Sequence, residues 1–236
     1  MEYAALTDVG MRRHNNEDSY IVNDLHENKI FIVADGMGGH NAGEIASLEA
    51  CRIVESYILE HEGDIDSILT EGVVKANRDI FVRASENPSL QGMGTTIDVC
   101  VLKEGKLHIA HAGDGRVYLL TKDGITKLTY DHSIVGMMLD EGSITEEEAM
   151  VHPQRNYITR AVGSSVNIEV DSISADVHSG EWVLMCTDGL TNMVSSDTMH
   201  KIVTGAENVN AAACELVRRA KEQGGDDNIT VVLLRV

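Results

Sequence analysis

The feature that most constrains the fold is the grouping of strand-like and helix-like segments into separate blocks along the sequence. Three short runs rich in alternating or β-branched residues come first, at 3–7, 19–23 and 30–34. Two long segments follow, at 42–62 and 65–84, in which apolar residues recur every three to four positions. Because strands and helices come in blocks, we expect an α+β fold in which helices cover the faces of sheets.

The second half of the sequence returns to strands and adds one more long helix. Strand-like runs separated by glycine-containing turns predict an antiparallel meander over 95–102, 106–112, 117–121 and 124–128. Two further strands, a third long helix and a last strand are expected at 168–175, 182–187, 206–223 and 228–236.

The segment at about 130–163 differs from its surroundings. It is more polar, carries a short helical piece at 145–150 and breaks at Pro153. We expect it to be an excursion from the core. The chain has 236 residues, of which 43% are hydrophobic, so it can bury one sizeable core, and we expect a single domain over 1–236.

Charge and cysteine content restrict the partners and the compartment. Acidic residues number 38 against 19 basic ones, which gives a formal charge of −19. Nucleic acids and anionic membranes attract basic surfaces, so we expect neither as a partner.

Cys51, Cys100, Cys186 and Cys214 are widely spaced and form no CxxC pair, which is typical of buried thiols in a reducing compartment. With no signal peptide and no membrane span in the sequence, we expect a cytoplasmic protein.

Carboxylates follow or precede three of the expected strands. Asp35-Gly36 ends the third strand, Asp188-Gly189 follows the strand at 182–187, and Asp226-Asp227 precedes the last one. Strand ends on a rigid sheet can bring distant carboxylates onto one hard cation. An isolated Asp-Gly pair more often marks an ordinary turn, and that alternative holds for each pair taken alone.

The residues around these carboxylates form six motifs that carry more information than any one pair. In sequence order they are Gly10-Met11-Arg12-Arg13-His14-Asn15-Asn16-Glu17-Asp18, Val33-Ala34-Asp35-Gly36-Met37-Gly38-Gly39-His40, Gly92-Met93-Gly94-Thr95-Thr96, Ala112-Gly113-Asp114-Gly115-Arg116, Cys186-Thr187-Asp188-Gly189-Leu190 and Gly225-Asp226-Asp227-Asn228-Ile229-Thr230. Together, and in this order, they resemble the metal-dependent protein phosphatases of type 2C, specifically the compact bacterial members. The resemblance covers essentially the whole chain.

The resemblance implies a β-sandwich of two mainly antiparallel sheets with helices on both outer faces. It also implies a binuclear Mg²⁺ or Mn²⁺ centre at one end of the sandwich. By resemblance, Asp35 bridges both cations, the Gly36 carbonyl binds the second, and Asp188 and Asp227 complete the first. Oxygen ligands of this kind suit hard divalent cations.

Further acids resemble supporting groups of the same centre. Asp18, with Glu17 beside it, matches the acidic pair that orients water at the metals; neighbours on a strand face opposite ways, so we expect unequal roles and favour Asp18. Asp114 resembles the residue that holds, with Asp188, a third and weaker cation. Gly115 follows it where the family commonly has serine, which puts any hydrogen bond of that hydroxyl in doubt.

Two basic residues match the family's catalytic groups. Arg13 corresponds to the phosphate-binding arginine, five residues before Asp18, whereas Arg12 is typical of a solvated surface charge. His40 lies where the family has its general acid, which protonates the leaving oxygen. The alternative for His40 is a histidine at a helix start with no chemistry.

The resemblance implies a protein serine/threonine phosphatase in which water, activated by the metal pair, attacks the phosphoryl group. Phosphorylated proteins and an opposing Ser/Thr protein kinase are the implied partners, and we expect a monomer. The segment at 130–163 resembles the family's flap. Two alternatives stay open: a phosphopeptide-binding module, which would need the loss of a metal ligand, and a metal-dependent hydrolase of nucleotides or phosphodiesters, because fold and metals do not fix the substrate.

Overall fold

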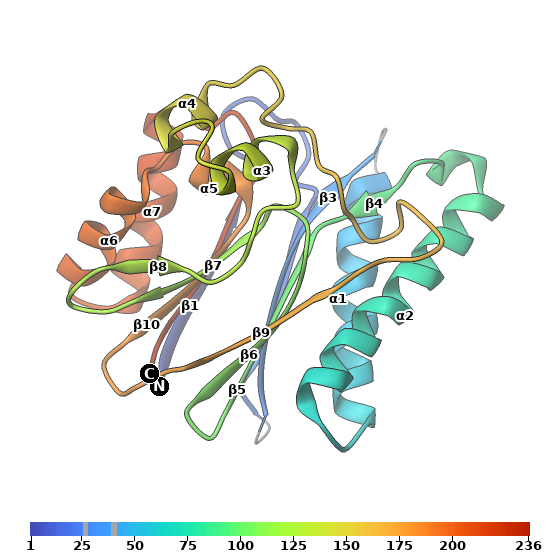
Figure 1. Cartoon of the computed structure of the whole chain (residues 1–236), viewed down its shortest axis with the longest axis horizontal. Helices are drawn as coiled ribbons and strands as arrows, with labels where there is room; N and C mark the ends of the chain where they lie inside the picture. The colour runs from blue at the N-terminus through green and yellow to red at the C-terminus, as the bar shows by residue number, and fades with distance from the viewer. Residues whose placement is uncertain (26–27, 39–41) are drawn as a thin grey trace.

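The computed structural model describes residues 1–25, 28–38 and 42–236, without the side chain of Met150. Its strands form two antiparallel sheets that lie face to face, and helices cover both outer faces (Figure 1). The expected α+β fold, a β-sandwich between two helical layers, is therefore confirmed.

The first sheet combines the beginning and the end of the described chain. Its strands are, in spatial order, β1 (Glu2–Asp8), β11 (Ile229–Arg235), β10 (Trp182–Cys186), β7 (Arg116–Leu120) and β8 (Ile125–Lys127). β1 pairs with β11 from Glu2↔Arg235 to Asp8↔Ile229. The outer face is covered by α5 (Asp188–Thr191), α6 (Ser196–Gly205) and α7 (Val209–Glu222) (Figure 1).

The second sheet contains the N-terminal hairpin and the central meander. Its order is β2 (Asp18–Asn23), β3 (Lys29–Met37), β5 (Ile97–Lys103), β6 (Lys106–Ala112) and β9 (Asp171–Asp176), with β4 (Gly94–Thr95) paired to the end of β3. Two long helices, α1 (Ala42–Glu60) and α2 (Ile65–Glu86), pack on its outer face, and the 3-10 turn η1 (Pro88–Leu90) follows them.

Strand alternation divides the core into three apolar layers. Side chains at successive positions of a strand point to opposite faces of its sheet. In β3, Ile30 and Ile32 pack toward α1 and α2, whereas Phe31 and Val33 lie between the two sheets. A third layer, which includes Leu216 of α7, lies under the helices of the first sheet. The layer between the sheets, here called the inner layer, matters most for the site.

The segment between β8 and β9 crosses one end of the sandwich. It contains α3 (Ile134–Asp140) and α4 (Glu146–Met150), which lie above α5 in Figure 1. α4 matches the helical piece expected at 145–150, and its first turn is closed by a capping box between Thr145 and Glu148. The two chain ends lie side by side at the opposite end of the sandwich (Figure 1).

Three expected elements differ from the structure. The helix predicted over 206–223 is present as α7 but begins only at Val209, where the Asn208 side chain accepts a hydrogen bond from the Ala211 N–H at 2.9 Å. The helix α6, which precedes it, was not predicted. The strand predicted at 168–175 starts at Asp171. The strand predicted at 95–102 is interrupted at Thr96, whose N–H donates to the Asp35 carbonyl at 2.9 Å.

Among the described residues, no helix is both long and apolar enough to cross a membrane.

Asn208→Ala should lower the free energy of unfolding by about 1 kcal/mol, because it removes the side-chain cap of α7 and leaves a helix N–H without its partner. Urea denaturation followed by circular dichroism measures the change. Ser195→Ala is the matched control: Ser195 is the N-cap of α6, but its hydroxyl bonds the exposed Thr198 hydroxyl at 3.0 Å and caps no backbone N–H of that helix, so its loss should be smaller. Equal losses in the two variants would contradict the capping role of Asn208.

Candidate active site

The inner layer changes from apolar to polar at one end of the sandwich. In β3, Phe31 and Val33 occupy inner positions, and Asp35 takes the next position on the same face. Asp18, the first residue of β2, lies opposite Asp35 in the β2–β3 pairing. The alternation that buries the apolar side chains therefore also directs these two carboxylates between the sheets.

Asp18 is buried between the two sheets. Its Oδ2 accepts hydrogen bonds from the hydroxyls of Thr187 (2.9 Å) and Thr230 (2.6 Å), while its buried Oδ1 has no partner. Burial raises the pKa of Asp18 to about 7; the two hydroxyls oppose this rise, and the charges of Asp188 and Asp227 add to it. Asp18 is thus held in place while one of its oxygens remains unsatisfied.

Asp188 and Asp35 form the centre of the cluster. Asp188 is the first residue of α5, just after β10, and its Oδ2 accepts from Asn192 Nδ2 at 3.0 Å, whereas its Oδ1 is buried without a partner. Burial and then the charge of Asp227 raise the pKa of Asp188 to about 6, and a side-chain hydrogen bond with Asp35 lowers it. Burial, followed by the charges of Asp18 and Asp188, holds the pKa of Asp35 well above its ordinary value.

Asp227 brings the predicted phosphate-binding arginine to the cluster. Its Oδ2 accepts a hydrogen bond from the Arg13 guanidinium at 2.8 Å, and its Oδ1 accepts from the Asn228 N–H at 2.8 Å. Arg13 is about half exposed, with 49% of its side-chain surface accessible, so one side of the guanidinium faces solvent. The sequence predicted both residues for the site, and the structure places them in contact.

Glu17 and Gly36 meet the first turn of α1. The Glu17 carboxylate accepts a hydrogen bond from the Gly43 N–H, and burial raises its pKa. The Glu17 carbonyl accepts from the Gly36 N–H at 3.1 Å. A side chain on Gly36 would put its Cβ 2.2 Å from the Gly43 carbonyl oxygen, so this close approach requires glycine. Glu17 and Asp18 therefore occupy different surroundings; the inequality of their roles stays a prediction.

Asp114 follows β6 and lies beside Asp188. Burial, then the charges of Asp188 and Asp131, holds the pKa of Asp114 well above its ordinary value. Asp114 and Asp188 line a cavity of about 80 Å³ between the 130–163 segment and α5. The remaining lining residues are Arg116, Lys127, Asp131, Ser133, Val135, Leu139, Glu146, Ala149, Arg155, Thr191, Asn192, Val194, Ser195 and Ser196.

The donor set fits hard divalent cations. Two buried carboxylate oxygens, Asp18 Oδ1 and Asp188 Oδ1, lack partners, and burial, followed by like charges, raises the pKa values of both groups. Within the described part of the chain, no three or more His, Cys, Asp or Glu side chains already stand close enough together to hold a metal ion. Mg²⁺ and Mn²⁺ keep several waters and need few protein ligands, so a small set of carboxylate oxygens is enough to hold them.

Sequence reasoning missed four residues that position the acids. Thr187, Thr230 and Asn192 donate to carboxylates, and Asn228 ties the 9–17 loop down by accepting from the Glu17 N–H and donating to two carbonyls of the loop. Three of the four lie inside the quoted motifs, which was the available signal. His40, the predicted general acid, lies outside the described residues.

Comparisons with known proteins cover nearly the whole chain. The family model for protein phosphatase 2C matches residues 11–233. The serine/threonine phosphatase stp of Listeria innocua is 38% identical over 237 residues, which cover 97% of this chain and 93% of that protein. The crystal structure of the Mycobacterium tuberculosis serine/threonine phosphatase PstP/Ppp has a TM-score of 0.90 at 36% identity, covering 100% of this chain and 98% of that one. The catalytic domain of PstP in complex with two manganese ions has a TM-score of 0.87 at 34% identity, covering 98% and 96%.

Chelator-treated protein should lose stability as the pH rises from about 5 to about 7.5. Asp18 and Asp188 have folded-state pKa values of about 7 and about 6, above their ordinary 3.8, so the folded state binds more protons across this window and stability falls as they are lost. Mn²⁺ should therefore raise Tm more at pH 7.5 than at pH 5.5.

Thermal melts of the wild type and of Asp188→Asn, with and without Mn²⁺, measure this effect. The histidines contribute equally to both proteins, so the difference between the two pH profiles isolates the carboxylate. The variant should show a flatter profile and a smaller Mn²⁺ shift. Identical profiles and identical shifts would show that Asp188 is not part of the titrating cluster.

Proposed function

Because this chain belongs to the protein phosphatase 2C family, we propose that it hydrolyses phosphoserine and phosphothreonine in proteins, with Mg²⁺ or Mn²⁺ as cofactor. The observation that carries this proposal is the convergence of Asp35, Asp188 and Asp227 at one end of the sandwich, with Arg13 bound to Asp227. A carboxylate cluster beside a guanidinium suits a phosphate ester with its cations.

The ligand assignments follow the family resemblance and the site geometry. Asp35, Asp188, Asp227 and the Gly36 carbonyl would hold the two core cations, with Glu17 and Asp18 beside them. A third cation would lie between Asp114 and Asp188, which line the same cavity. When bound, the cations would make a water molecule more acidic and neutralise charge on the phosphoryl oxygens.

The side chains of this protein contribute binding and proton transfer. Arg13 is suited to hold two phosphoryl oxygens, and its ion pair with Asp227 limits the directions in which the guanidinium can point. Asp18 Oδ1 is buried without a partner, so it is suited to accept a hydrogen bond from the attacking water and orient it. His40 would protonate the departing serine or threonine oxygen.

The residues around the carboxylate cluster would select the substrate. We propose that residues 1–236 form one catalytic domain and that the 130–163 segment acts as a flap over the cleft, since it lies against Asp114 and Asp188. A formal charge of −19 disfavours nucleic-acid substrates. The substrates that fit best are phosphoproteins, and the phosphatase would oppose the Ser/Thr protein kinase that phosphorylates them. We further propose that the protein acts as a cytoplasmic monomer.

Asp227→Asn should reduce phosphate release from a phosphothreonine peptide by at least about a hundredfold, because it removes a metal ligand and the partner of Arg13. Its neighbour Asp226 provides the matched control, because Asp226 is exposed and forms only long ion pairs with Arg12 (3.7 Å) and Arg155 (3.6 Å). Asp226→Asn should stay within a few-fold of wild type. Each protein is assayed with Mn²⁺ and with excess chelator. Wild-type turnover that survives the chelator would refute the metal-dependent mechanism.

His40→Ala should slow phosphopeptide hydrolysis by about a hundred- to ten-thousandfold if His40 is the general acid. Hydrolysis of para-nitrophenyl phosphate should fall far less, since nitrophenolate leaves without a proton. Steady-state kinetics on both substrates measure the ratio. Equal losses on the two substrates would assign His40 a structural role.

A further inference from the structure

A histidine–aspartate pair is buried in the inner layer next to the proposed active site. Asp98 of β5 and His111 of β6 face each other in the strand pairing, and both are essentially inaccessible, at 1% and 0% exposure. Their neighbours on the same face are apolar residues such as Cys100 and Ile109. A buried charged pair is a poor way to stabilise a core, because desolvation offsets most of the attraction. We therefore expect the Asp98–His111 pair to have a role other than stabilising the core.

His111 uses both ring nitrogens to connect two parts of the chain. Nδ1 lies 2.7 Å from Asp98 Oδ1, and Nε2 lies 2.8 Å from the Tyr130 carbonyl oxygen. A carbonyl can only accept, so Nε2 carries a proton and donates to Tyr130. Burial opposes the charged ring, but Asp98 and the Tyr130 carbonyl together raise the pKa of His111. Asp98 thereby orients a ring whose other nitrogen holds the start of the 130–163 segment.

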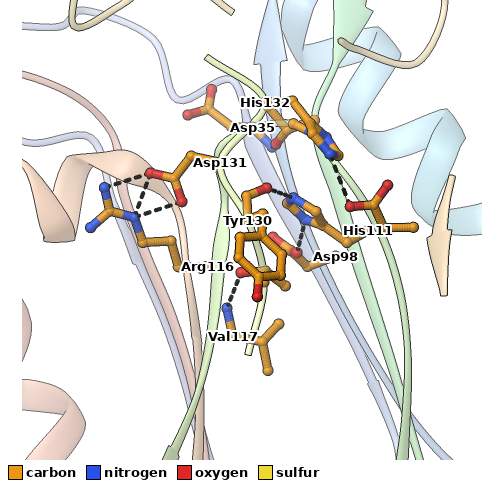
Figure 2. A network of polar contacts seen from close by, with 12 residues as sticks. Asp35, Asp98, His111, Arg116, Val117, Tyr130, Asp131 and His132 are labelled. Carbon is orange, nitrogen blue, oxygen red and sulfur yellow. Dashed lines mark hydrogen bonds and ion pairs between the residues drawn. The ribbon is translucent and has the colours of Figure 1, made fainter. Parts of the chain in front are cut away.

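Three consecutive residues at the start of that segment, Tyr130, Asp131 and His132, are bonded to residues on both sides of Asp114. Figure 2 shows the bonds of Tyr130 to His111 and of Asp131 to Arg116. Asp131 accepts from the Arg116 guanidinium at 2.6, 2.9 and 3.1 Å. The His132 N–H donates to the Gly113 carbonyl at 2.7 Å, and the Gly113 N–H donates back to His132 Nδ1 at 3.0 Å. The rings of His132 and His111 lie against each other at an angle of 32°, with centroids 4.6 Å apart. Residues 111, 113 and 116 thus bind the segment on both sides of Asp114.

Asp98 also determines which residue can follow Asp114. A Cβ on Gly115 would lie 2.0 Å from Asp98 Oδ2, a distance that no side chain tolerates. The Asp98 carboxylate therefore fills the space beside Gly115, between Asp114 and Arg116. Any side chain at 115 would push the carboxylate away from His111.

We propose that Asp98 and His111 are positioning residues that fix the Asp114 carboxylate and the base of the 130–163 segment as one unit. This role depends on the proposed function in one respect, which is that Asp114 is taken to be a ligand of the third cation. Outer partners of this kind set the orientation of a ligand and the affinity of its site. Loss of the pair should loosen residues 130–134 and weaken the cation site at Asp114, without unfolding the sandwich.

The test replaces the pair as a unit, because one change alone leaves an unpaired buried charge. Asp98→Val/His111→Leu keeps an apolar, similarly sized core, so it should fold. Gly115→Ala is a second route to the same defect, since its Cβ displaces the Asp98 carboxylate. The matched control is Asp66→Val/His108→Leu. His108 lies on the same strand and pairs with Asp66 at 2.8 Å, but this pair joins β6 to α2 on the outer face.

Two measurements are made on each protein. Hydrogen–deuterium exchange of the chelator-treated protein follows residues 130–134, where the His132 N–H is bonded to Gly113. Phosphopeptide hydrolysis gives the Mn²⁺ concentration for half-maximal activity. Asp98→Val/His111→Leu and Gly115→Ala should speed exchange at 130–134 and raise that concentration by about ten- to a hundredfold. The control should match wild type in both.

Unchanged exchange at 130–134 in Asp98→Val/His111→Leu, or an equal change in the control, would overturn the positioning role. Faster exchange with an unchanged Mn²⁺ response would overturn the link to Asp114. A wild-type protein without Mn²⁺-dependent activity would refute the proposed function instead, and the exchange data would still decide whether the pair holds the segment.

Discussion

The mutual repulsion of carboxylates enclosed at one end of the inner layer is the constraint around which the rest of the structure is arranged. Asp18 and Asp35 are held there by β2 and β3, and Asp188 by the first turn of α5, so the packing of the apolar layers keeps the three carboxylates close. Burial and like charge raise their pKa values, and threonine hydroxyls offset part of the rise at Asp18. Carboxylates that are costly to keep charged and are braced by a rigid sandwich suit the binding of divalent cations.

The segment at 130–163 is attached directly to the strands that carry the acids. At its start, residues 130–132 are bonded to the turn around Asp114. At its end, Val162 exchanges two backbone hydrogen bonds with Thr95, at 3.0 and 2.8 Å, and the Thr95 hydroxyl donates to the Asp35 carbonyl at 2.8 Å. A displacement of this segment would therefore be transmitted to Asp114 and Asp35 through a few short hydrogen bonds.

Local pattern was sufficient to predict an α+β fold with helices on the faces of sheets, but not the contacts between distant segments. Alternation in β3 and periodicity in α1 and α2 give this prediction because burial sets both patterns, whereas the sandwich and the roles of the acids came from the family resemblance. The helix α6 was missed because its sequence offers few apolar positions, with only Met199 and Val203 fully buried. The sequence did not indicate a role for Asp98 and His111. That role depends on the pairing of β5 with β6 and on the Tyr130 carbonyl, which lies 19 residues from His111 in the sequence.

The pairing of β1 with β11 has a consequence for how the protein is made. β11 lies between β1 and β10 in its sheet, so β1 has no strand partner in that sheet until residues 229–235 have been synthesised. Asp227 directly precedes β11, whereas Asp18 and Asp35 come from the first strands of the other sheet. The nascent chain thus lacks part of the cluster until residues 227–235 have been made, and contacts of such long sequence separation form late. Synthesis of this segment becomes the step that completes the cluster.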